Sequence, residues 1–130
     1  DVQRPNSNEM RLRGKFRTDA QGKFWFWTVR PTEYPVPTDG PVGQMPLKMG
    51  RHPYRPAHIH TIVSAPGYEP VTTHVFVEGD RYLDSDAVFG VKDSLVVGFV
   101  LHEPGVAPDG TKMRRPYFIV NYDFGLKAAV

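Results

Sequence analysis

The sequence predicts an all-β protein, and three observations support that fold class. Apolar and polar residues alternate with period two along much of the chain, as they do in half-buried strands. No stretch of a dozen residues has the apolar spacing of an amphipathic helix. Glycine (12) and proline (13) together make about a fifth of the 130 residues, which favours short strands joined by many turns. We therefore expect one domain over residues 1–130, an antiparallel or mixed β-sandwich with long irregular loops.

The first expected element is a hairpin with strands over residues 10–16 and 23–29. Its turn, residues 18–22, ends on Gly22, where a left-handed backbone is needed. The next segment, residues 31–56, is rich in proline, which removes hydrogen-bond donors from a sheet. We expect this segment to be irregular, and loops of this length in compact domains are usually functional or disordered.

Four further strands are predicted after the proline-rich segment. Turn residues such as Ala65-Pro66-Gly67 and Glu78-Gly79-Asp80 separate them at regular intervals. The expected strands cover residues 57–64, 71–77, 94–101 and 116–122.

Composition excludes several classes of function. The chain has no cysteine, so any metal must be held by nitrogen and oxygen ligands. The formal net charge is only +2, which argues against a nucleic-acid partner. The longest apolar run, residues 95–101, is far shorter than the roughly 18 residues of a membrane span. Because the sequence starts at Asp1 and not at Met, we expect that an upstream segment has been removed.

His58-Ile59-His60 is the first candidate for chemistry. Side chains two residues apart on a strand point to the same face, so two imidazoles could converge on one ion. A histidine pair on a strand also commonly makes ordinary hydrogen bonds, and both interpretations stay open. His74 lies in the middle of the strand predicted over residues 71–77, where it could line a pocket or sit in the core.

Arg55 and Tyr34 flank these histidines in the sequence. Pro56 restricts the backbone next to Arg55, which could face an anionic substrate or be a solvated charge. Tyr34 lies among three prolines, and a rigid segment favours a metal ligand. A phenol has a pKa of about 10, so a tyrosine binds as phenolate only beside a strong Lewis acid such as Fe(III). A hydrogen-bonded core tyrosine is the alternative.

The remaining polar and aromatic candidates have simpler interpretations. We expect His52 and His102 to be structural, and Asp84 and Asp86 to form or cap turns. Trp25 and Trp27 share one strand face, in the sheet interior or at an interface.

Taken together, three segments resemble the catalytic domain of intradiol aromatic-ring dioxygenases. The resemblance runs from the first residues to about residue 103, and the segments that carry it are residues 35–43, 50–60 and 79–89. It implies a non-haem Fe(III) held by two tyrosines and two histidines. Tyr34, His58 and His60 take three of these places, and Arg55 takes that of the arginine that steadies negative charge on the ring.

The fourth ligand of that family, its first tyrosine, has no counterpart here. Asp1-Val2-Gln3 resembles the stretch that directly follows this tyrosine, so we expect it just upstream. The resemblance also implies an upstream helical domain through which the intact enzyme forms a homodimer, and a cytoplasmic location. We therefore expect the chain to be a fragment that retains iron weakly when alone.

The resemblance further implies a substrate. Histidine at position 74, together with residues 34–40, resembles the hydroxyquinol 1,2-dioxygenases, whereas the catechol-cleaving relatives usually have glutamine there. We expect O2 to be inserted between the two hydroxylated carbons of hydroxyquinol (benzene-1,2,4-triol), giving 3-hydroxy-cis,cis-muconate and then maleylacetate. Tyr34 and Arg55 would be catalytic, and Val36, Pro37, Arg55 and His74 would contact the substrate.

Three alternatives stay open from the sequence. The substrate could be catechol or chlorocatechol. His58 and His60 could instead belong to a cupin-like divalent-metal site, which needs a third histidine or carboxylate on a neighbouring strand and gives Tyr34 no role. The chain could also be a non-catalytic β-sandwich module that binds carbohydrate or protein through Trp25, Trp27 and the proline-rich loop.

Overall fold

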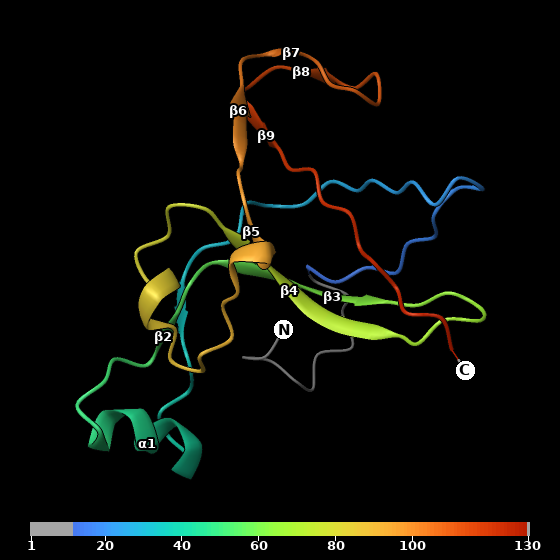
Figure 1. The fold of residues 1–130 in the computed structure, drawn as a ribbon. Helices are drawn as coiled ribbons and strands as arrows, with labels where there is room; N and C mark the ends of the chain where they lie inside the picture. The colour runs from blue at the N-terminus through green and yellow to red at the C-terminus, as the bar shows by residue number, and fades with distance from the viewer. Residues whose placement is uncertain (1–11, 130) are drawn as a thin grey trace. The chain divides into compact units, whose positions relative to one another are not determined.

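The computed structural model describes residues 12–129, and these form two compact units. The first ends at Arg30 and the second begins at Pro31. Figure 1 shows the ribbon of both. Each unit is a body of its own, and the candidate site lies entirely within the second.

In the first unit the turn is as predicted but the flanking strands are not. The Asp19 N–H donates to the Lys23 carbonyl, the Gly22 N–H donates to the Asp19 carbonyl, and Gly22 has a φ of 80°. Residues 12–16 and 23–29 have no regular strand, so the strand expectation is wrong there; residues 10 and 11 lie outside the described part. Trp25 and Trp27 are exposed within this unit, and the Phe16 and Phe26 rings stack at 4.7 Å.

The second unit is built around one three-stranded mixed sheet. β3 (His58–Val63) pairs antiparallel with β4 (Val71–Val77), and β4 pairs parallel with β5 (Val96–Val97). β3 and β4 form the long pair of arrows in Figure 1. β4 has the predicted bounds. Val75, Phe76 and Val77 at its end are buried, and Phe76 is fully enclosed, so this end of the strand belongs to the core.

Three two-stranded sheets complete the unit. β1 (Tyr34–Pro35) pairs with β2 (Tyr54–Arg55), β6 (Val100–His102) with β9 (Tyr117–Ile119), and β7 (Gly105–Val106) with β8 (Lys112–Met113). Short 3-10 helices, η1 (Leu83–Ser85) and η2 (Asp93–Leu95), lie between β4 and β5. The strand expected over residues 94–101 is thus divided between η2, β5 and β6. Strands are the main regular elements of the described residues, with one α-helix beside them, which agrees with the all-β prediction. A two-layer sandwich stays a prediction.

One α-helix lies inside the segment predicted to be irregular. α1 (Pro41–Lys48) is eight residues long, which is shorter than the dozen residues that an amphipathic apolar spacing needs to be recognised in a sequence. Pro41 starts it, because the first helical residue needs no N–H partner and its φ is already helical. In the part of the chain that the structure describes, no helix is long and apolar enough to span a membrane.

Candidate metal and substrate site

Short strand pairs bring the candidate side chains together. Tyr34 of β1 lies opposite Arg55 of β2. Three residues further on β3 begins at His58, and His60 lies opposite His74 of β4. Directly opposed residues of an antiparallel pair point to the same face, as do residues two apart on one strand. The three histidines therefore share one face of the sheet.

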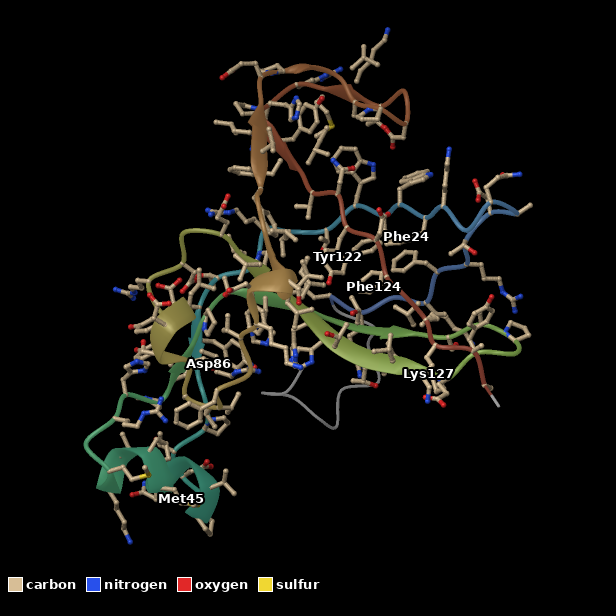
Figure 2. The ribbon with its side chains drawn as sticks, in the orientation of Figure 1. Phe24, Met45, Asp86, Tyr122, Phe124 and Lys127 are labelled. Carbon is tan, nitrogen blue, oxygen red and sulfur yellow. The ribbon has the colours of Figure 1, made fainter. Side chains whose placement is uncertain are left out.

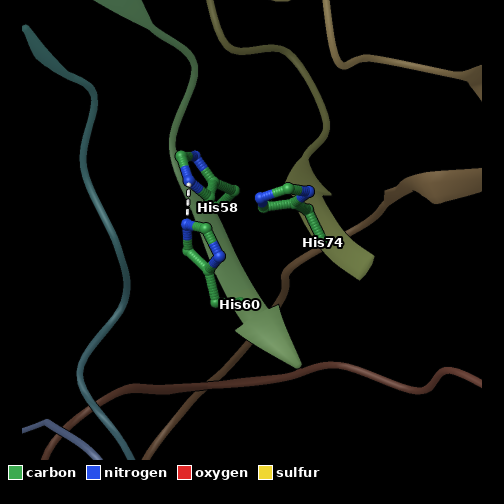
Figure 3. Close-up of side chains that lie close together, drawn as sticks. All are labelled: His58, His60 and His74. Carbon is green, nitrogen blue, oxygen red and sulfur yellow. Dashed lines mark hydrogen bonds between the residues drawn. The ribbon is translucent and has the colours of Figure 1, made fainter. Parts of the chain in front are cut away.

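The histidine side chains form a tight cluster. One ring nitrogen from each of His58, His60 and His74 lies within 4.8 Å of the others, and Nε2 of His58 is 3.1 Å from Nε2 of His60 (Figure 3). His58 is buried, His74 is half-buried and His60 is exposed. The cluster is thus open to solvent on the side of His60.

The surroundings keep these imidazoles neutral. Burial lowers the pKa of His58 and of His60, and the Arg55 charge lowers both further, although the Pro56 carbonyl acts against this at His58. Burial, followed by the neighbouring His60 and His58, lowers the pKa of His74 to about 4. A neutral imidazole is the form that binds a metal.

The hydrogen bonds fit a metal ion among these rings. His58 Nδ1 is 2.7 Å from the Pro56 carbonyl oxygen, which can only accept, so Nδ1 carries the proton and Nε2 presents its lone pair to the cluster. Two nitrogens that bind one ion at right angles, each at about 2.1 Å, stand about 3.0 Å apart, close to the observed His58–His60 separation. His74 Nε2 is buried and has no hydrogen-bond partner among the described residues. Imidazole donors suit iron, copper, nickel and zinc.

Tyr34 and Arg55 border the cluster. The Tyr34 ring centre is 5.4 Å from that of His58, and Arg55 Nη1 is 3.4 Å from His58 Nε2. Burial would lower the pKa of Arg55, but Asp86 and, to a smaller extent, Tyr34 raise it above its ordinary value. A fixed cation and a phenol thus lie beside the three imidazoles.

Val36 and Pro37 follow Tyr34 along the chain. The Val36 N–H donates to the Pro53 carbonyl at 2.9 Å, which fixes this segment next to β2. Val36 is half-buried and Pro37 is exposed. Their expected contact with substrate stays a prediction.

Asp86 lies at the border of the site, although from the sequence we expected it only to form or cap a turn. The carboxylate of Asp86, which is labelled in Figure 2, accepts the N–H groups of Val88 and Gly90, as a turn former does. It also binds Arg55 through two hydrogen bonds. Asp86 lies 31 residues after Arg55, and no local pattern links them. Only its place in the resembling segment, residues 79–89, could have drawn attention to it.

His52 has the structural role expected of it. The Tyr54 N–H donates to Nδ1 of His52 at 3.1 Å, so the proton is on Nε2, which donates to Ser85 Oγ at 2.9 Å. This tautomer cannot take a proton from Ser85, and the contact is therefore not a catalytic dyad.

Comparison with known proteins shows the family of the chain. The family model described as Dioxygenase (Dioxygenase_C) matches residues 1–127. The chain belongs to the intradiol ring-cleavage dioxygenase family. It is 55% identical over 91 residues to hydroxyquinol 1,2-dioxygenase of Rhizobium sp. (strain MTP-10005), covering 70% of this chain and 31% of that protein. It is 49% identical over 105 residues to 6-chlorohydroxyquinol 1,2-dioxygenase of Cupriavidus pinatubonensis, covering 81% and 38%.

A solved structure is similar to this intradiol dioxygenase chain over almost its whole length. Hydroxyquinol 1,2-dioxygenase from Pseudomonas putida DLL-E4 matches with a TM-score of 0.85 and 45% identity, covering 98% of this chain and 45% of that one. The chain spans about a third of the length of the curated relatives named above. The family resemblance seen in the sequence is therefore confirmed.

Proposed function

We propose that the protein is a non-haem Fe(III) dioxygenase that cleaves hydroxyquinol between its two adjacent hydroxylated carbons. Both atoms of O2 enter the product, 3-hydroxy-cis,cis-muconate, which tautomerises to maleylacetate. The observation that carries this proposal is the pairing of Tyr34 with Arg55 directly beside the His58–His60 pair. The family match and the relatives named for hydroxyquinol substrates support it.

In this proposal, Tyr34, His58 and His60 hold the iron. The two histidines offer neutral Nε2 lone pairs, and Tyr34 offers an anionic oxygen once its phenol is deprotonated. When bound, Fe(III) supplies Lewis acidity that favours the ionised diol and activates its ring toward O2.

The side chains around the iron ligands handle protons and charge. The Tyr34 phenolate oxygen can take a proton from a substrate hydroxyl, acting as a general base. Arg55 keeps its proton and presents Nη1 at the cluster, where it offsets negative charge on the substrate oxygens. This charge costs no reorganisation during reaction because the guanidinium is already held in place.

His74 gives a physical basis for the choice of substrate. Its buried Nε2 has no partner within the described residues, so it can bond the additional hydroxyl that distinguishes hydroxyquinol from catechol. Val36 and Pro37 would form the apolar wall of the pocket. Catechol or chlorocatechol is the alternative substrate. His74→Gln should lower kcat/KM for hydroxyquinol relative to kcat/KM for catechol.

Replacement of Tyr34 tests the proposed function. The full protein that contains this chain should show a visible band from phenolate-to-Fe(III) charge transfer and consume O2 with hydroxyquinol. Tyr34→Phe should weaken and shift that band and lower kcat by about 100-fold, because a charged ligand and a base are both lost. Tyr68→Phe, which removes a phenol outside the cluster, should change neither.

The same variant tests the cupin-like alternative. His74 lies on the neighbouring strand, where that alternative needs a third histidine. If Tyr34→Phe keeps its metal, colour and activity while His74→Gln loses its metal, the three histidines form the ligand set and the proposed function is wrong.

We further propose that the intact enzyme is a cytoplasmic homodimer joined through an upstream helical domain, as the sequence resemblance implies. Its partners would be a small aromatic diol or triol and O2, and no nucleic acid. Light scattering on the intact enzyme should give twice the mass of one chain, and a monomer would contradict this.

A further inference from the structure

Arg55 and Asp86 form a buried ion pair with two parallel hydrogen bonds. Arg55 Nε is 3.0 Å from Asp86 Oδ1, and Arg55 Nη2 is 3.1 Å from Oδ2. The two side chains are 7% and 2% exposed. Such a pair is costly to desolvate. Removing only one partner strongly destabilises the folded protein, because the other charge is left buried and uncompensated.

The carboxylate of Asp86 is fixed from the other side by its own loop. Val88 and Gly90 donate their N–H groups to Oδ1 and Oδ2 at 3.3 and 2.8 Å. A Cβ on Gly90 would lie 3.0 Å from Arg55 Nη2 and 3.2 Å from Asp86 Oδ2. The backbone of Gly90 thus packs so close to the ion pair that little space is left for a side chain at this position. The loop is also tied to β2, since the Ala87 N–H donates to the Tyr54 carbonyl at 3.1 Å.

This fixation determines which way Arg55 points. A guanidinium is planar, so holding the edge formed by Nε and Nη2 also sets the direction of Nη1. Nη1 is the nitrogen that lies 3.4 Å from His58 Nε2, at the histidine cluster. Asp86 thus contacts the site through Arg55, and its negative charge also acts on His58 and His74, whose pKa it raises.

The pair also balances charge at the cluster. Burial would raise the pKa of Asp86, but hydrogen bonds from Arg55, Gly90 and Val88 outweigh it and lower the pKa below its ordinary value. The carboxylate is therefore ionised at neutral pH. Without it, an uncompensated guanidinium would stand beside nitrogens that bind a cation, and like charges in a buried site repel strongly.

We propose that Asp86 is a positioning residue of the site: it directs Nη1 of Arg55 at the histidine cluster and cancels the Arg55 charge that would otherwise oppose metal binding. The metal-binding half of this proposal rests on the proposed function, whereas the orientation of Arg55 does not.

A double-mutant cycle on the full chain separates this role from loop stabilisation. The variants are Asp86→Asn, Arg55→Gln and their combination, with Glu69→Gln as a matched control that breaks the exposed pair with Lys127. The first measurement is the dissociation constant for Co(II) added to the metal-free protein. Asp86→Asn should weaken Co(II) binding by about ten-fold, because Arg55 is left uncompensated.

The combined variant gives the decisive result. Removing both charges should restore Co(II) binding to within about three-fold of wild type, since the repulsion has gone. If the combined variant is as weak as Asp86→Asn or weaker, Asp86 acts through its loop and the proposal is wrong. If Asp86→Asn does not fold, the combined variant is compared with the wild type alone: Co(II) affinity within about three-fold supports the proposal, and a larger loss refutes it.

A second measurement reports the orientation of Arg55 without any metal. In the 1H–15N spectrum the Arg55 Nε–H should exchange slowly with water in the wild type and in Glu69→Gln, and rapidly in Asp86→Glu, whose longer side chain displaces the pair. Slow exchange in Asp86→Glu would overturn the positioning role. If the wild type binds no Co(II) yet its Nε–H exchanges slowly, it is the proposed function that fails.

Discussion

His74 shows how one residue acquires a role from its neighbours. In the sequence it is a histidine in the middle of a strand, equally suited to a core or a pocket. In the structure it faces His60 across the β3–β4 pair, its Nε2 lacks a partner among the described residues, and its pKa is about 4. The combination of burial and an unused nitrogen makes it a candidate for ligand or substrate contact.

The lowered pKa of His74 predicts a pH dependence of stability in the metal-free protein. The unfolded chain takes up this proton near the ordinary histidine pKa of 6.5, whereas the folded chain takes it up only near 4. The unfolded state thus binds more protons between these values, and the free energy of unfolding falls as the pH drops through this window. From about pH 7 to about pH 4.5 we expect His74 to account for a loss of about 2 kcal/mol.

Urea unfolding with a chelator at both pH values checks this expectation. His74→Gln cannot take up the proton, so the variant should lose less stability on acidification than the wild type by that amount. An equal loss in the two proteins would show that His74 titrates alike in the folded and unfolded states.

At the scale of elements, α1 depends on one buried glycine. A Cβ on Gly43 would collide with the backbone of Pro37 and Thr38, the segment that follows the proposed ligand Tyr34. The Gln44 side chain also donates to the Thr38 carbonyl. The helix therefore contacts this segment through the packing of Gly43 and through the hydrogen bond of Gln44. Gly43 thus allows α1 to lie directly against the chain that carries Tyr34 and Val36.

Gly43→Ala should therefore destabilise the protein, although alanine favours a helix over glycine by about 1 kcal/mol. Steric overpacking against backbone costs about 1–3 kcal/mol, so after the helix gain we expect a net loss of about 1 kcal/mol in chemical denaturation. Gly125→Ala is the control, because open space surrounds that position. A stabilised Gly43→Ala variant would mean that α1 can move away from residues 37 and 38 without cost.

For the whole molecule, the prediction is that metal binding stabilises the fold. An ion that binds only the folded chain adds about 2.7 kcal/mol at about 100 times its dissociation constant, and we expect Tm to rise by about 10 °C. Calorimetry with and without chelator should show this rise for the wild type and for His102→Ala. His60→Ala, which removes a cluster nitrogen, should show none. A rise that survives in His60→Ala would place the metal elsewhere.

Prediction from sequence succeeded where the pattern is local. The bounds of β4 and most of β3 follow from alternation, and the shared face of His58 and His60 follows from the two-residue period of a strand. The prediction failed where an element is short or unpaired. The helix α1 has only about two turns and lies within a proline-rich segment. Residues 23–29 alternate between apolar and polar side chains but form no regular strand. Short elements are stabilised by contacts with distant residues, which alternation does not report.

The amino-acid sequence by itself determined the donor groups, the strand that carries two of them, and the family to which they belong. Only the tertiary structure decided that Tyr34 lies opposite Arg55, that His74 lies opposite His60, and that Asp86 holds Arg55. The physical reason is that hydrophobic periodicity depends on neighbours along the chain, whereas burial and charge pairing depend on which segments meet when it folds.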